Sequence, residues 1–172
     1  SRILLATIKL IEDRWNVDHD TEQGRVRVIL LVEDSVRRLS SSLPMIYTEL
    51  MTQTRKVMAE GLNYVDKLLR MRARPKILLA RDYEEAQRLY RKYRKNVLTV
   101  ISDVRFPRDG EMDPSAGLKY LAWIREQDPR LPVVMHSAEP ENRGPSEDLS
   151  SYFLDKNSQT WLQDLHEFFV TH

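Results

Sequence analysis

The sequence has no cysteine among its 172 residues. This absence excludes disulfide bonds, thiol catalysis and cysteine-ligated zinc, and it fits a reducing compartment, so we expect a cytoplasmic protein. Glycine is scarce as well, with 5 residues. Neither a glycine-rich dinucleotide turn nor a P-loop is present, and nucleotide binding is therefore poorly supported.

An excess of charge of one sign and long hydrophobic runs are also lacking. The chain has 27 basic and 26 acidic residues and a net charge of +1, so no overall field favours nucleic acid or an anionic membrane. Apolar runs such as VILLV at 28–32 are far shorter than a membrane span. The length suits one domain with a substantial core and is too short for two large ones.

Residues 1–24 are expected to form a helix and a linker outside the main domain. ILLATIKLIEDRW at 3–15 places apolar residues on a helical stripe, whereas NVDHDTEQG at 16–24 is polar and ends in glycine. Because the first residues already have a helical pattern, we expect a piece of a longer protein, with neighbouring or output domains missing. Residues 25–172 are expected to form the main domain.

Short apolar runs alternate with helical patterns through the rest of the chain. The runs are VILLVEDS after Arg27, KILLA at 76–80, VLTVIS at 97–102, PVVMHS at 132–137 and YFLDK at 152–156. Helical patterns cover 82–95, 115–127 and 160–172. The alternation predicts an α/β protein with a five-stranded parallel sheet and helices on both faces.

The segment 35–74 is about twice as long as a connection between parallel strands needs. Its apolar residues keep helical spacing, which predicts a long helix or a helical hairpin inserted over about 42–74. Pro44 is expected to kink or restart this helix, and Gly61 is a second weak point. A long amphipathic helix must cover its apolar stripe, so the insert is a candidate homodimer interface.

The stretch 55–76 carries seven basic residues against two acidic ones. A solvated helix face is the expected explanation. Nucleic-acid binding through Arg70, Arg72 and Arg74 is an unlikely alternative, and it would require strongly salt-dependent affinity.

Charged and hydroxyl residues follow or end four of the predicted strands. These residues are Glu33 and Asp34, Asp103, Ser137 and Lys156. Ligands bind outside the carboxyl ends of the strands in such sheets. Carboxylates held close together repel one another unless a cation lies among them, and Mg²⁺ suits Asp34 and Asp103, with Glu33 acting through water.

Such a cluster suits phosphoryl transfer to a carboxylate. Asp103 would be the nucleophile that forms an acyl phosphate, Lys156 would contact one phosphoryl oxygen, and the Ser137 hydroxyl would donate to another. Movement of Ser137 toward the phosphate would link chemistry to shape. Acyl phosphates hydrolyse, so the signal would be self-limiting, and whether the chain is an enzyme stays open. Taken singly, Asp103 also fits a turn former or a helix cap, and Glu33-Asp34-Ser35 fits the capping of a helix N-terminus.

The blocks ILLVEDS, ISDVRFP, PVVMHSA and FLDK resemble, in order, the signature blocks of response-regulator receiver domains. The resemblance covers roughly residues 25–172. It implies a flavodoxin-like fold, assistance by Mg²⁺, and a histidine kinase or phosphotransfer protein as phosphoryl donor. The implied residues are the acidic pair Glu33 and Asp34, the phosphoacceptor Asp103, the switch hydroxyl Ser137, the lysine Lys156, the metal-ligating backbone carbonyl of Arg105 and the switch aromatic Phe153.

The sequence departs from this family pattern in several places. Asn157 stands where the family typically has a proline, PENRGPSED predicts a short or irregular fourth helix, and EMDPSA at 111–116 lengthens the loop after the phosphoacceptor strand. With the insert at 42–74, the chain looks most like receiver-type domains attached to phosphoenolpyruvate synthase-like proteins.

Two other classes remain to be weighed. A pseudo-receiver would keep the fold as a dimerisation or docking module without phosphorylation, as the insert and the short fourth helix would allow. A haloacid-dehalogenase-type phosphatase would need a second acid two residues after Asp103, where this chain has Arg105. His136 is expected to be a strand residue at the edge of the site.

Overall fold

The fold is built around a five-stranded parallel sheet with the strand order β2-β1-β3-β6-β7. The computed structural model describes residues 2–24, 26–58 and 74–171. The strands of the sheet are β1 (Val28–Val32), β2 (Lys76–Ala80), β3 (Val97–Asp103), β6 (Val133–Ser137) and β7 (Tyr152–Asp155). All residues of β1 and β6 are buried, as is typical of strands covered on both faces.

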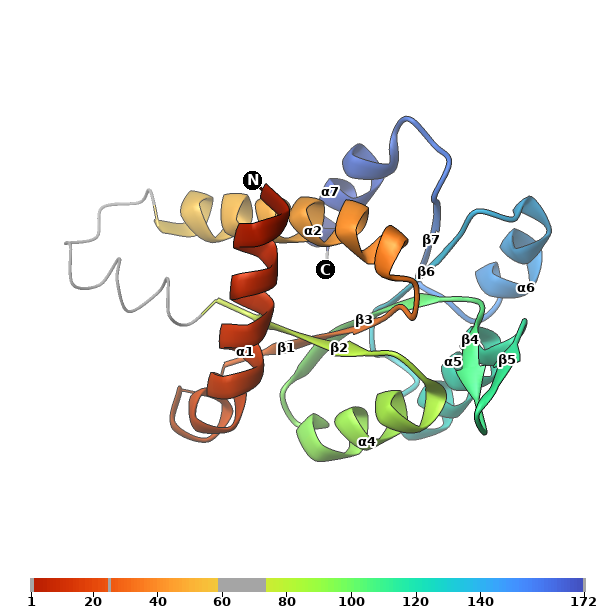
Figure 1. Cartoon of the computed structure of the whole chain (residues 1–172), viewed down its shortest axis with the longest axis horizontal. Helices are drawn as coiled ribbons and strands as arrows, with labels where there is room; N and C mark the ends of the chain where they lie inside the picture. The colour runs from red at the N-terminus through yellow and green to blue at the C-terminus, as the bar shows by residue number, and fades with distance from the viewer. Residues whose placement is uncertain (1, 25, 59–73, 172) are drawn as a thin grey trace.

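Helices cover both faces of this sheet (Figure 1). One face packs against α2 (Val36–Met58) and α7 (Trp161–Thr171), and the other against α4 (Tyr83–Tyr93) and α5 (Ala116–Gln127). Alternate residues of β1 belong to the two cores, because strand side chains point to opposite faces in turn. The flavodoxin-like α/β architecture expected from the sequence is confirmed.

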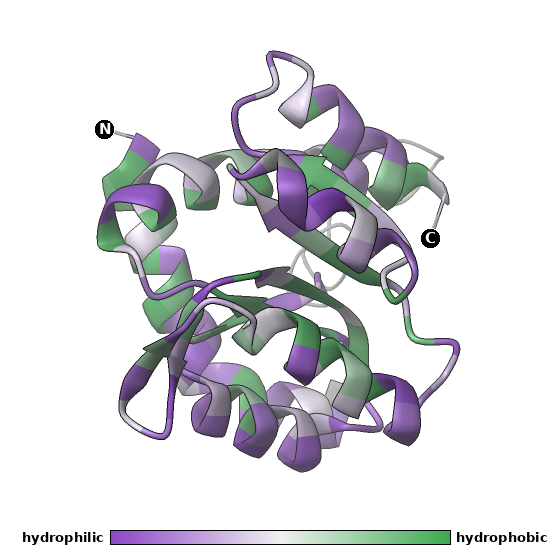
Figure 2. Cartoon of the chain, turned by 90° about the vertical axis from the view of Figure 1, so that its right-hand side faces the viewer, coloured by the Kyte–Doolittle hydropathy of each residue, from purple (hydrophilic) through white to green (hydrophobic). Residues whose placement is uncertain are grey.

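Apolar and polar residues are distributed according to these layers. Figure 2 shows apolar strands enclosed between helices whose outward surfaces are largely hydrophilic. Among the described residues, no helix is both long enough and apolar enough to cross a membrane.

The connection between β6 and β7 is short. It holds a 3-10 turn (Pro140–Asn142) and the five-residue helix α6 (Arg143–Glu147). The short or irregular fourth helix expected from the sequence is confirmed.

The N-terminal helix α1 (Arg2–Gly24) is longer than expected and packs against β2 and α2. The expected linker at 16–24 is wrong, because the helix continues through those polar residues. Two of their acidic side chains pair with other elements: Asp20 with Lys76 on β2 at 2.8 Å, and Asp18 with Lys92 on α4 at 2.8 Å. Whether residues 25–172 fold as a domain without α1 stays a prediction.

A buried carboxylate fixes α1 to its neighbours. Asp13 is 0% exposed and accepts hydrogen bonds from the Arg74 guanidinium at 2.7 and 3.0 Å. It also accepts from the Tyr47 hydroxyl at 2.8 Å and from the backbone N–H of Ile77 at 2.9 Å. Since a buried charge requires pairing and hydrogen bonding, these contacts determine where α1 lies.

The long helix expected after β1 is present as α2, which is described as far as Met58. It runs through Pro44 and does not restart there. Leu43 and Ile46 on either side of the proline are buried in the core with α1 and α7, and this packing holds the helix together. Gly61 and the remainder of 59–73 lie outside the described residues.

A small hairpin follows β3. Strand β4 (Phe106–Arg108) pairs antiparallel with β5 (Glu111–Asp113). Asp109 and Gly110 connect them with φ values of 53° and 81°, the backbone of a tight hairpin turn. The sequence predicts only a lengthened loop here, and the hairpin goes beyond that prediction.

Candidate phosphoacceptor and metal site

The residues singled out at the strand ends meet at the carboxyl edge of the sheet. Glu33 and Asp34 follow β1, Asp103 ends β3, Ser137 ends β6 and Lys156 follows β7. Because β1, β3, β6 and β7 are consecutive neighbours in one parallel sheet, their ends lie at the same edge.

Three carboxylates form a cluster at this edge. Glu33, Asp34 and Asp103 each offer one oxygen, and these oxygens lie within 4.8 Å of one another. Glu33 and Asp103 are each 1% exposed, whereas Asp34 is only partly buried. Oxygen donors in this arrangement fit a hard divalent cation such as Mg²⁺.

Lys156 lies against two of the carboxylates. Its ammonium donates to Asp103 Oδ2 at 2.8 Å and to Glu33 Oε2 at 3.0 Å, and its side chain is 12% exposed. The structure therefore brings together the ammonium group and the acids that the sequence analysis assigned to one pocket.

The two buried acids ionise differently. Burial raises the pKa of Glu33, and attraction to Lys156 offsets this only in part. Burial also opposes ionisation of Asp103, but attraction to Lys156 and hydrogen bonds from Lys156 and from the backbone N–H of Val104 hold the pKa of Asp103 below its usual range. Asp103 is thus favoured as the carboxylate anion, which is the form that can act as a nucleophile.

A further cation reaches the site from α2. Arg38 Nη1 donates to Asp103 Oδ2 at 2.9 Å, and the Arg38 side chain is 45% exposed. Arg38 is not among the site residues predicted from the sequence. The sequence does contain a signal for Arg38, which is its position four residues after Asp34. One helical turn brings a side chain at that position back toward the end of β1.

Ser137 is 4% exposed and faces the turn that follows β6. Its hydroxyl oxygen accepts hydrogen bonds from the backbone N–H of Glu139 at 3.1 Å and from Asn142 Nδ2 at 2.9 Å. Both bonds use Ser137 as an acceptor, so its own O–H stays available to donate.

The two remaining predicted positions are Arg105 and Phe153. Arg105 lines the cavity beside the site, and its backbone carbonyl as a metal ligand stays a prediction. Phe153 is partly buried on β7, with the Arg143 guanidinium 5.3 Å from its ring centroid. Its role as a switch aromatic also stays a prediction.

His136 is 1% exposed and pairs with Asp103 in the register of β6 and β3. Burial, reinforced by repulsion from Lys156, lowers the pKa of His136 to about 3. The ring is therefore neutral near pH 7. Its Nε2 atom is without a hydrogen-bond partner among the described residues.

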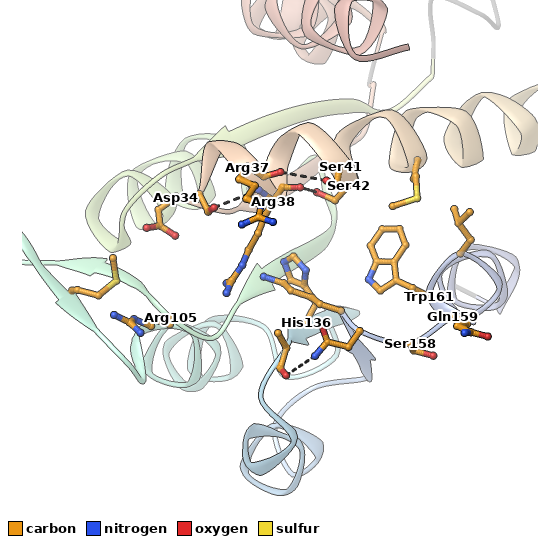
Figure 3. A pocket seen from close by; sticks show the side chains of 17 residues that line it. Asp34, Arg37, Arg38, Ser41, Ser42, Arg105, His136, Ser158, Gln159 and Trp161 are labelled. Atoms are coloured by element: carbon orange, nitrogen blue, oxygen red, sulfur yellow. Dashed lines mark hydrogen bonds between the residues drawn. The ribbon is translucent and has the colours of Figure 1, made fainter. Parts of the chain in front are cut away.

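An open cavity of about 870 Å³ lies above these residues, between α2 and α7. Figure 3 shows Arg38 reaching into it from α2 and Trp161 from the start of α7, with His136 between them. Asp34 and Lys156 also line it. The site can thus be reached by a molecule from outside.

Gly117 lets α5 approach the end of β3 closely. Its backbone N–H donates to the carbonyl oxygen of Val104 at 2.9 Å. A Cβ atom at this position would lie 2.2 Å from the Asp103 carbonyl oxygen and 2.8 Å from Val104 Cα. Only glycine fits here without moving the segment that carries Asp103.

Comparison with solved structures identifies the fold. The N-terminal domain of an uncharacterized protein from Wolinella succinogenes matches with a TM-score of 0.55 and 21% identity, over 85% of this chain and 92% of that one. A response regulator receiver domain protein from Clostridium thermocellum matches with a TM-score of 0.51 and 16% identity, over 85% and 93%. This chain has the receiver-domain fold. Neither the protein-family models nor the curated sequences give a match.

The receiver fold accounts for the position of the site. Identities of 16% and 21% show the fold alone, so any chemistry has to be argued from the residues of this chain. Those residues are three clustered acids, one shared ammonium group and one hydroxyl.

Proposed function

We propose that this receiver-fold chain is a phosphoacceptor domain of a two-component or phosphorelay system, phosphorylated on Asp103. The observation that carries the proposal is the 2.8 Å contact between Lys156 Nζ and Asp103 Oδ2 within the acidic cluster. A buried carboxylate kept ionised beside an ammonium group is suited to nucleophilic attack on phosphorus.

In the proposed reaction, a carboxylate oxygen of Asp103 forms a bond to the phosphorus of the donor. The bond between phosphorus and the donor breaks, and the donor keeps that electron pair. A phosphohistidine of a histidine kinase or phosphotransfer protein is the proposed donor, because its imidazole, when protonated on the other ring nitrogen, leaves as a neutral group. Hydrolysis of the resulting acyl phosphate would end the signal.

The other residues would stabilise the product. Lys156 would neutralise one phosphoryl oxygen, and Ser137 would turn its available O–H toward another. Glu33, Asp34 and Asp103 would hold a Mg²⁺ ion, which when bound neutralises charge on the phosphoryl group. The turn at 139–142 would then lose its bonds to Ser137, which offers a route from phosphorylation to a change in shape.

Mass measurement of the intact chain tests the proposal. Incubation with Mg²⁺ and a small acyl phosphate is expected to add one phosphoryl group, and Asp103→Asn is expected to abolish the gain. Asp109→Asn is the matched control, because Asp109 is an 84% exposed aspartate in the nearby hairpin turn, and it should leave the gain intact. Absence of any gain in the unmodified chain would favour the pseudo-receiver alternative.

The nucleic-acid alternative is weakened by two of its basic residues. Arg74 and Lys76 have side chains only 7% and 9% exposed and are paired with Asp13 and Asp20. They are therefore not available to phosphate groups. Most of the basic stretch, 59–73, lies outside the described residues.

The expectation of a homodimer through 42–74 depends on an apolar stripe that has to be buried against another surface. Within α2 the sheet, α1 and α7 already cover this stripe, since Leu43, Ile46 and Leu50 are buried. The described side chains of this part of the insert, which extend to Lys56, thus supply no reason for a second copy. A dimer through the insert, and attachment to a phosphoenolpyruvate synthase-like protein, stay proposals.

A further inference from the structure

Both carboxylate oxygens of Asp103 are already engaged. Oδ1 accepts from the backbone N–H of Val104 at 2.7 Å. Oδ2 accepts from Lys156 at 2.8 Å and from Arg38 at 2.9 Å. A carboxylate oxygen has about two lone-pair positions, so the two cationic donors fill those of Oδ2.

The two cations on Oδ2 are held unequally. Lys156 is 12% exposed and is bound to Glu33 as well as to Asp103. Arg38 is 45% exposed, and Asp103 is its one side-chain partner among the described residues. A group that needs Oδ2 will therefore displace Arg38 before Lys156.

Arg38 also changes the charge that an incoming cation meets. Glu33, Asp34 and Asp103 supply three negative charges when ionised, and Lys156 and Arg38 supply two positive ones. The net charge is −1 with Arg38 in place and −2 once it has left. Attraction of a divalent cation to the cluster is correspondingly weaker while Arg38 is bound.

We infer that Arg38 is a built-in competitor of the divalent cation at the Asp103 cluster. The guanidinium neutralises Asp103 in the metal-free protein and has to swing toward the open cavity before the cation can use Oδ2. Arg38 thus makes access to the phosphoacceptor dependent on cation concentration. This inference rests on the metal site of the proposed function, but it concerns binding and requires no phosphoryl transfer.

Binding of Mn²⁺ by the whole chain tests the inference. Arg38→Met keeps a long side chain and removes the charge, and it is expected to tighten Mn²⁺ binding by about fivefold to tenfold. The free Mn²⁺ signal in electron paramagnetic resonance measures binding directly, and Mg²⁺ titrated as a competitor should show the same ratio. Mg²⁺ should also raise the melting temperature of the variant more than that of the unmodified chain.

Arg37→Met is the matched control, because Arg37 is exposed, adjacent and makes no contact with Asp103 among the described residues. It is expected to change Mn²⁺ affinity less than about twofold. Equal affinity of Arg38→Met and the unmodified chain would overturn the inference, and so would an equal gain in Arg37→Met. If Mn²⁺ binds neither the unmodified chain nor Arg38→Met, the inference fails together with the metal site. The phosphorylation of Asp103 is still decided separately by mass.

Discussion

Gly117 is the residue at which α5 comes closest to the phosphoacceptor strand. We expect Gly117→Ala to lower the free energy of unfolding by about 1–3 kcal/mol, because the new methyl group would clash with backbone atoms that cannot rotate away. Urea unfolding followed by circular dichroism measures this change. Phosphorylation of Asp103 by a small acyl phosphate should slow in the same variant, since its backbone must shift.

Gly144 provides the control for this substitution. No atom outside its neighbours lies within 4 Å of the position that a Cβ would take there. Gly144→Ala should therefore leave stability unchanged or raise it by up to about 1 kcal/mol, through better helix propensity. Equal effects of the two substitutions would show that the close approach of α5 is unimportant.

At the residue scale, the sequence predicts the site better than its surroundings. Asp103 and Lys156 could be assigned because strand ends in a parallel sheet must converge. Arg38 could not, since its contact depends on which rotamer of an exposed side chain reaches Asp103. Asp13 could not be assigned either, because its partners Tyr47 and Arg74 lie 34 and 61 positions away in the chain.

Elements buried on both faces are the most predictable. The run at 76–80 coincides with β2 as observed, because a continuous apolar run bounded by charged residues has few alternatives. The hairpin of β4 and β5 was missed although Asp109-Gly110 is a strong turn signal, since each strand has only three residues. The extension of α1 through 16–24 depends on ion pairs with other elements, which a local pattern does not reveal.

The helix α2 contains a proline that its packing has to accommodate. Pro44 has no N–H to donate to the carbonyl of Ser40, and its ring crowds the preceding turn. We expect Pro44→Ala to raise the free energy of unfolding by about 1–3 kcal/mol, measured by urea unfolding. A loss of stability would instead show that the packing of Leu43 and Ile46 depends on the proline ring.

On the scale of the whole molecule, one carboxylate connects three elements. Asp13 on α1 binds Tyr47 on α2 and Arg74 just before β2. We expect Asp13→Ala to destabilise the protein by about 3–5 kcal/mol, because it leaves the Arg74 charge buried without an anionic partner. Thermal and urea unfolding measure the loss.

Glu12→Ala removes the same charge one residue earlier, from an exposed position on the same helix. This control should change stability by less than about 0.5 kcal/mol. If Asp13→Ala were equally mild, α1 would be an appendage of the fold and residues 25–172 could be treated as an independent domain.

The bond between Asp13 and Arg74 also has a mechanical consequence. A displacement at the N-terminal end of α1 would not be lost in a flexible connection, because α1 is one continuous helix. The bond between Asp13 and Arg74 holds it near its middle. The displacement would pass through the Arg74 guanidinium to the start of β2, which directly follows the long insertion. A displacement of α1 would thereby be passed to β2, the edge strand of the sheet.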